Sequence, residues 1–180
     1  VPFLGSVVAL ALLPAATLGL MAAARQAADG RFPMPTVLAT ALTSGSAQRM
    51  AMLRLGALYA AGFMGVIGVT ALVDGGAFAQ VYLNGNPLSE ELARDDRFQA
   101  ALWVGMALYI PLAMLFWHAP ALVHWHGVEP VKSLFFSAMA CWKNKGALLV
   151  FGASWMGVFT LGGLTMSLAA SALGGPAVAG

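Results

Sequence analysis

Charged residues are scarce in this chain. Lys, Arg, Asp and Glu together make up 9% of its 180 residues, whereas an ordinary soluble domain has about 25%. Hydrophobic residues make up 60%, and the mean hydropathy is +0.81. A soluble fold of this size would need more charge to cover its surface. We therefore expect lipid to cover much of this protein.

Cysteine is also nearly absent, since Cys141 is the one residue of its type. A single cysteine excludes an intrachain disulfide and a multi-cysteine metal site, and its apolar neighbours favour a small buried side chain. The formal net charge is only +2, and the basic residues fall in three separated segments without forming a stripe. We therefore expect no nucleic-acid partner.

Four long runs contain no charged residue at all: Val1–Ala24, Leu55–Val73, Ala100–Trp117 and Ala147–Leu173. A hydrocarbon core about 30 Å thick is crossed by roughly 20 helical residues. Lipid offers the backbone no hydrogen-bond partner, so such runs must become helices. The sequence predicts an all-α, polytopic transmembrane helix bundle. It would be a single transmembrane domain over residues 1–180, with spans at about 1–24, 55–73, 100–117 and 147–173.

The three connecting segments differ in charge. Residues 25–54, 74–98 and 118–146 carry four, two and three basic residues, respectively. Because Lys and Arg mark cytoplasmic loops, the first and third loops are predicted to be cytoplasmic and the second to lie outside. Both ends of the chain would then be outside. Since a chain normally starts inside, we expect a further span before Val1 and a longer protein of about six spans.

The third loop has the pattern of an amphipathic helix at about residues 129–144. Its apolar stripe follows helical spacing: Val131, Leu134, Phe135, Ala138, Met139 and Trp142. Two interpretations use this stripe. The helix could lie in the cytoplasmic membrane interface, or it could pack across the ends of the other helices.

Weaker patterns mark the other loops. Residues 36–54 suggest a short interfacial helix, a turn at residues 43–46 and entry into the second span near Met52. In the outer loop, Ser89 precedes two glutamates, as in a capped helix start. Asp74, followed by two glycines, is interpreted as a turn or helix-end residue rather than an ion-coupling site.

Small residues recur along the predicted spans at spacings that allow helices to approach closely. The rows are Ala15, Gly19 and Ala23; Gly62, Gly65 and Gly68; Ala101 and Gly105; and Gly163, Ser167 and Ser171. We interpret them as helix contacts, either within the bundle or with other membrane subunits.

Three histidines gather at the end of the third span: His118, His124 and His126, with Trp117 and Trp125 among them. Such side chains suit the headgroup zone as an interfacial belt. Imidazole can also bind a metal, haem or pigment, or carry a proton. These three interpretations stay open, and no other cofactor site is expected.

Several segments resemble a family of uncharacterised bacterial multi-pass inner-membrane proteins. The resemblance rests on residues 2–5, 74–76, 108–112, 117, 119–123, 125–127, 132–137 and 140–141. It implies inner-membrane localisation and further spans at each end. It implies no catalytic residue, because no activity is established for the family. The family pattern has an aromatic residue in place of His118, so a shared ligand role fits His126 better.

No motif for catalysis is present. We expect a non-enzymatic structural or accessory subunit that contacts the lipid bilayer and other integral membrane proteins. A small-solute carrier or channel is the first alternative, and haem, pigment or metal binding through the histidines is the second. An enzyme acting on lipid stays open, although no residue points to one.

Overall fold

The computed structural model describes residues 2–172, and every element in that range is a helix. The elements are α1 (Pro2–Ala28), the 3-10 helix η1 (Pro35–Ala39), α2 (Thr40–Thr43), α3 (Ser46–Asp74), α4 (Ala77–Tyr82), α5 (Glu90–Arg94), α6 (Asp96–Phe116), α7 (Ala119–His126), α8 (Pro130–Lys143) and α9 (Lys145–Ala172). The predicted all-α fold class is confirmed.

Four segments are long and apolar enough to cross a membrane: Leu4–Ala28, Ser46–Asp74, Asp96–His126 and Lys145–Ala172. Each of these segments contains one of the four predicted runs almost completely. The first run also included residues 1–3 and the fourth also included residue 173. Positions 1 and 173 lie outside the described residues. The chain divides into two compact units, Val1–Ala140 and Cys141–Gly180. The prediction of a single transmembrane domain stays a prediction.

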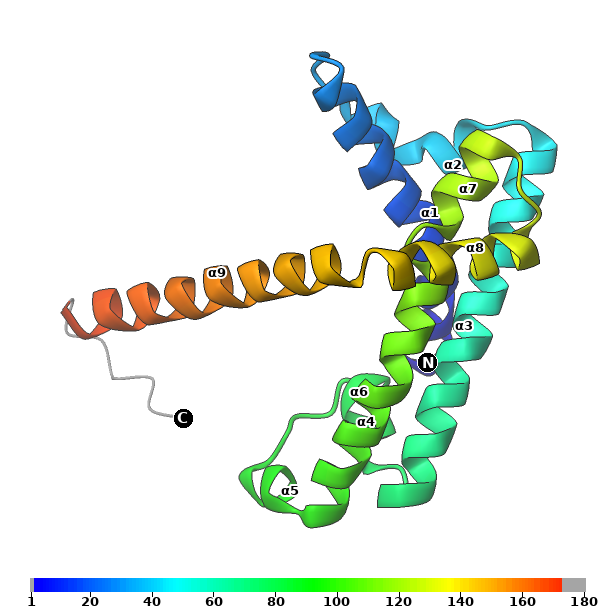
Figure 1. The fold of residues 1–180 in the computed structure, drawn as a ribbon. Helices are drawn as coiled ribbons and strands as arrows, with labels where there is room; N and C mark the ends of the chain where they lie inside the picture. The colour runs from blue at the N-terminus through cyan, green and yellow to red at the C-terminus, as the bar shows by residue number, and fades with distance from the viewer. Residues whose placement is uncertain (1, 173–180) are drawn as a thin grey trace. The chain divides into compact units, whose positions relative to one another are not determined.

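In the first unit, α3 and α6 run side by side and α1 packs against α3 (Figure 1). The core lies where these helices meet α7, and its fully buried members include Leu18 of α1 and Leu55 of α3. The ring of Tyr59 meets that of Phe116 edge to face, with centroids 5.0 Å apart. Apolar contacts thus join the second and third spans.

Glycines allow the closest approaches in this unit. A Cβ atom at Gly56 would overlap the carbonyl oxygen of Ala11, and one at Gly62 would clash with the side chain of Leu112. Gly56 is therefore required for the crossing of α1 and α3. Of the predicted row on α3, Gly65 and Gly68 have no atom within 4 Å of such a Cβ.

The turns follow local hydrogen-bonding rules. Asp74 ends α3 and accepts hydrogen bonds from the backbone N–H groups of Gly76 and Phe78, at 2.8 and 2.6 Å. It is therefore a turn residue, as predicted. Ser89 caps α5 by accepting from the Leu92 N–H at 3.2 Å, again as predicted. Asp95 caps α6 in the same way, and no sequence pattern had indicated this.

The second span-capable helix begins earlier than expected. The predicted break after Thr43 is present, but α3 starts at Ser46 rather than near Met52. A helix can extend beyond the lipid into water, so its charged first turns do not end it. Arg49 and Arg54 consequently lie on α3 itself.

The second unit contains the end of α8 and the helix α9. Within α9, Phe151, Trp155 and Phe159 form a ladder of ring contacts, with successive centroids 6.3 and 5.6 Å apart. The row Gly163, Ser167 and Ser171 also lies on this helix.

Candidate functional site

The helical run is interrupted at Trp117 and His118, between α6 and α7, and we call this break the corner. Helix α6 ends at Phe116, and α7 starts at Ala119 with a proline in its first turn. Proline suits this position because its missing N–H would lack a partner there anyway. Helix α7 ends at His126 and is followed by Gly127, whose φ of 62° is in the left-handed region that favours glycine.

Ser137 of α8 bridges this corner. Its hydroxyl accepts a hydrogen bond from the backbone N–H of His118, at 2.9 Å, and donates one to the carbonyl of Met114, at 2.8 Å. In an unbroken helix the His118 N–H would donate directly to the Met114 carbonyl. The serine hydroxyl is thus inserted into the helical ladder, an arrangement known to kink helices.

The bridge also determines which face of α8 meets the bundle. Ser133 and Ser137 are fully buried, whereas Val131, Phe135 and Met139 are 65%, 62% and 40% exposed. These stripe residues therefore do not supply the contact, and both interpretations of this helix stay predictions. Leu134 alone of the stripe packs against the core. The open stripe supports a helix lying in the interface.

The three histidines occupy different surroundings. His118 lies at the corner, His124 is half-buried on α7, and His126 is exposed at the end of that helix. Positions two apart on a helix point to different sides, so His124 and His126 diverge. In residues 2–172, no group of three or more His, Cys, Asp or Glu side chains could hold a metal ion. The ligand role of these histidines stays a prediction.

His124 has a polar neighbour from the first loop. Its Nδ1 atom lies 3.4 Å from the hydroxyl oxygen of Ser44, which itself donates to the carbonyl of Thr40 at 2.6 Å. A neutral ring protonated at Nδ1 could donate to this hydroxyl oxygen, and its Nε2 atom would then carry the free lone pair.

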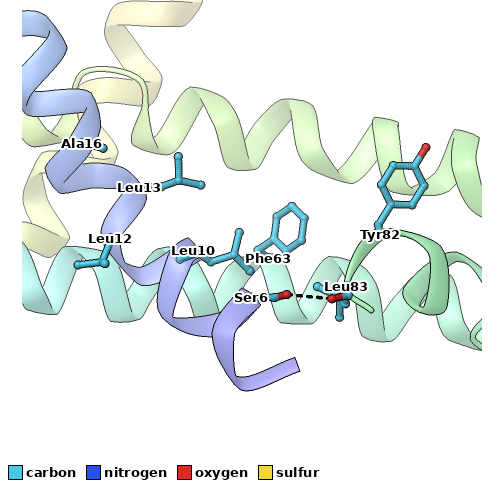
Figure 2. Close-up of a pocket in the computed structure, with 9 residues that line it drawn as sticks. Ser6, Leu10, Leu12, Leu13, Ala16, Phe63, Tyr82 and Leu83 are labelled. Atoms are coloured by element: carbon cyan, nitrogen blue, oxygen red, sulfur yellow. Dashed lines mark hydrogen bonds between the residues drawn. The ribbon is translucent and has the colours of Figure 1, made fainter. Parts of the chain in front are cut away.

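An apolar groove of about 620 Å³ lies along α1 and reaches α3 and the end of α4 (Figure 2). Its lining includes Ala9, Leu10, Leu13, Ala16, Phe63 and Leu83. The hydroxyl of Ser6, at its edge, donates to the carbonyl of Leu83 at 2.8 Å. This chemistry suits a hydrocarbon chain or an apolar helix better than a hydrophilic solute. The carrier or channel role stays a prediction.

Sequence reasoning missed three features of the first unit. Ser137 lies 19 residues beyond the backbone N–H that it bridges, and it falls outside the apolar stripe from which the helix was predicted. The groove depends on where α1 crosses α3, which spacing alone does not give. The overlap at Gly56 could have been suspected only from the presence of a glycine in a span.

Comparison with known proteins places the chain in a family. It is 39% identical to a probable inner membrane protein of Burkholderia thailandensis, in a match that covers 96% of this chain and 67% of the relative. The chain belongs to this family of bacterial inner-membrane proteins. It is thus a multi-pass protein of the inner membrane, as the resemblance implied. No protein-family profile matches it, and no solved structure does.

Proposed function

We propose that this inner-membrane protein is an accessory subunit that packs against a helix of another integral membrane protein. The supporting observation is the open groove along α1 (Figure 2). Its alanines at positions 9 and 16 are exposed, and larger apolar side chains surround them. Such a surface can accept the ridge of a neighbouring helix.

In a membrane, the shape of an apolar surface indicates whether another helix can pack against it. Apolar side chains gain little by leaving lipid for another helix, so association depends on close packing and shape. The glycine contacts inside the first unit show that this chain already packs its own helices in this manner. The groove extends the same type of surface outward.

Purification in mild detergent, followed by mass spectrometry of co-eluting proteins, tests the proposal. We expect one membrane protein to co-elute in constant ratio. Ala9→Phe fills the groove from an exposed position and should remove that partner while leaving the protein folded.

Ala61→Phe is the matched control. Ala61 is exposed on α3 and does not line the groove, so this variant should retain the partner. A wild-type protein that elutes alone would refute the proposal. So would equal loss of the partner in both variants.

A second candidate function, ligation of haem, pigment or metal, is favoured by the environment of His124. A ligating histidine commonly donates its other ring N–H to a nearby acceptor, and Ser44 is positioned to accept here. An absorption spectrum and metal analysis of the purified protein would test it. His124→Ala and His126→Ala should abolish any signal if these residues are ligands, and an empty wild-type protein would remove the candidate.

A further inference from the structure

Arg25, in the last turn of α1, is held against Trp125 of α7. Its guanidinium carbon lies 5.0 Å from the centre of the indole ring. Trp125 is half-buried and packs against the core of the first unit. The cation therefore rests on a surface that the fold itself fixes, and cation–π attraction favours this position.

Arg25 has no anionic partner in the described part of the chain. The nearest acidic residue in the sequence is Asp29, just beyond the end of α1, and its carboxylate pairs with Arg31 at 3.2 Å. The planar guanidinium carries five N–H donors in a fork that matches a phosphate. Arg25 is exposed, so this fork is accessible to a ligand from the membrane surface.

The surrounding end of the first unit is basic. It carries Arg25, Arg31, Arg49, Arg54 and Lys132 against two acidic residues, Asp29 and Glu129, and both acidic residues are already paired with a cation. The positive-inside rule places this end at the cytoplasmic leaflet, which contains anionic lipids.

We propose that Arg25, supported by Trp125, binds the phosphate of an anionic phospholipid headgroup. The charge-free length of α1 that precedes Arg25 gives the acyl chains an apolar wall. Tryptophan suits the headgroup level because its ring is amphipathic. A free phosphate could bind the arginine in the same way, but it has no acyl chain to contact the apolar surface of α1. That surface therefore favours the lipid over free phosphate.

Native mass spectrometry of the purified protein in mild detergent tests this proposal. Phosphatidylglycerol and phosphatidylcholine are titrated separately, and inorganic phosphate is added in a third series. We expect one phosphatidylglycerol to be retained at concentrations where phosphatidylcholine is lost. Arg25→Gln should raise the concentration for half-occupancy about tenfold, as loss of a charge-assisted hydrogen bond does. Arg25→Lys should fall between, because lysine keeps the charge but not the planar fork.

Arg54→Gln is the matched control. It removes the same charge from the same end of the unit, at an exposed arginine for which no ion pair or ring contact is recorded in residues 2–172. It should change the affinity by less than about twofold. Equal weakening by both variants would overturn the proposal in favour of a diffuse basic surface. Equal retention of phosphatidylcholine, or occupancy by inorganic phosphate at the same concentration as the lipid, would also overturn it.

Discussion

Replacing Ser137 with alanine would remove the one hydroxyl that joins α8 to the corner between α6 and α7. The N–H of His118 loses its acceptor, and the carbonyl of Met114 loses one donor. The change is buried and small, so it creates almost no steric effect.

The magnitude follows from two limits. If the corner keeps its shape, the unpaired N–H of His118 costs about 1–3 kcal/mol. If the corner relaxes, the His118 N–H can donate directly to the Met114 carbonyl, and much of that cost is recovered. Relaxation, however, moves the chain away from α8. We expect a net loss of about 1–3 kcal/mol in the free energy of unfolding, together with faster hydrogen exchange at His118.

Ser133→Ala is the control, because Ser133 is equally buried but donates only to Pro130 within the start of its own helix. Its removal should cost about 0.5–1.5 kcal/mol and leave exchange at His118 unchanged. Unfolding by SDS in mixed micelles gives the free energies, and exchange followed by mass spectrometry gives the local effect. Equal destabilisation by both variants, with no change at His118, would refute the bridging role of Ser137.

Three further predictions concern other parts of the chain. Gly56→Ala should destabilise the protein by about 1–3 kcal/mol in the same SDS titration, because the new methyl group overlaps the Ala11 carbonyl, whereas Gly65→Ala should be neutral or slightly stabilising. Asp74→Ala should cost about 1–2 kcal/mol, since two backbone N–H groups lose their acceptor, and undiminished stability would contradict the capping role. Burial raises the pKa of the Cys141 thiol, so less thiolate is present at neutral pH. Maleimide labelling should therefore be slow at pH 7, quicken as pH rises towards that pKa, and become fast once SDS unfolds the protein. Labelling of the folded protein at the rate of a free thiol would contradict this.

The spanning helices could be predicted because their cause is local. A charge-free run in lipid has no choice but to pair its own backbone groups. The bounds were less predictable. Helix α3 continues through Arg49 and Arg54 to Ser46, since a helix that leaves the lipid is not obliged to stop. Composition predicts which residues of a helix lie in the lipid. The residue at which the helix begins is determined instead by capping residues such as Asp95.

Helix α8 shows what periodicity cannot decide. The stripe containing Val131, Phe135 and Met139 predicted a helix, and the helix is present. In water such a stripe would turn towards the core. Beside a membrane the stripe can face lipid. The face that packs against the bundle is then the one whose side chains can form hydrogen bonds with it. Ser137 is buried because the corner has two backbone groups to satisfy, and that need arises only in the folded bundle.

Only part of the candidate sites could be predicted, because some of their residues are distant in the sequence. His118, His124 and His126 lie within nine positions, so the sequence alone suggests a histidine site. On the helix, however, His124 and His126 point to different sides. Arg25 and Trp125 lie 100 residues apart, and only the packing of α1 against α7 brings them together. Isolated basic residues near a span are common, so no pattern distinguished Arg25 from its neighbours.

Three features coincide at one end of the first unit. The basic residues gather there, Trp125 contacts Arg25 there, and α8 with its open stripe follows α7 after a short connection. The opposite end carries five acidic residues, including the capping residues Asp74 and Asp95, against two arginines. Inserted the other way, the chain would place its acidic end in the cytoplasm and its basic end outside, against the positive-inside rule. The open stripe would then also lack the anionic leaflet that suits its basic surroundings. Charge, aromatic placement and amphipathicity therefore favour the same orientation, with α7 and α8 at the cytoplasmic face.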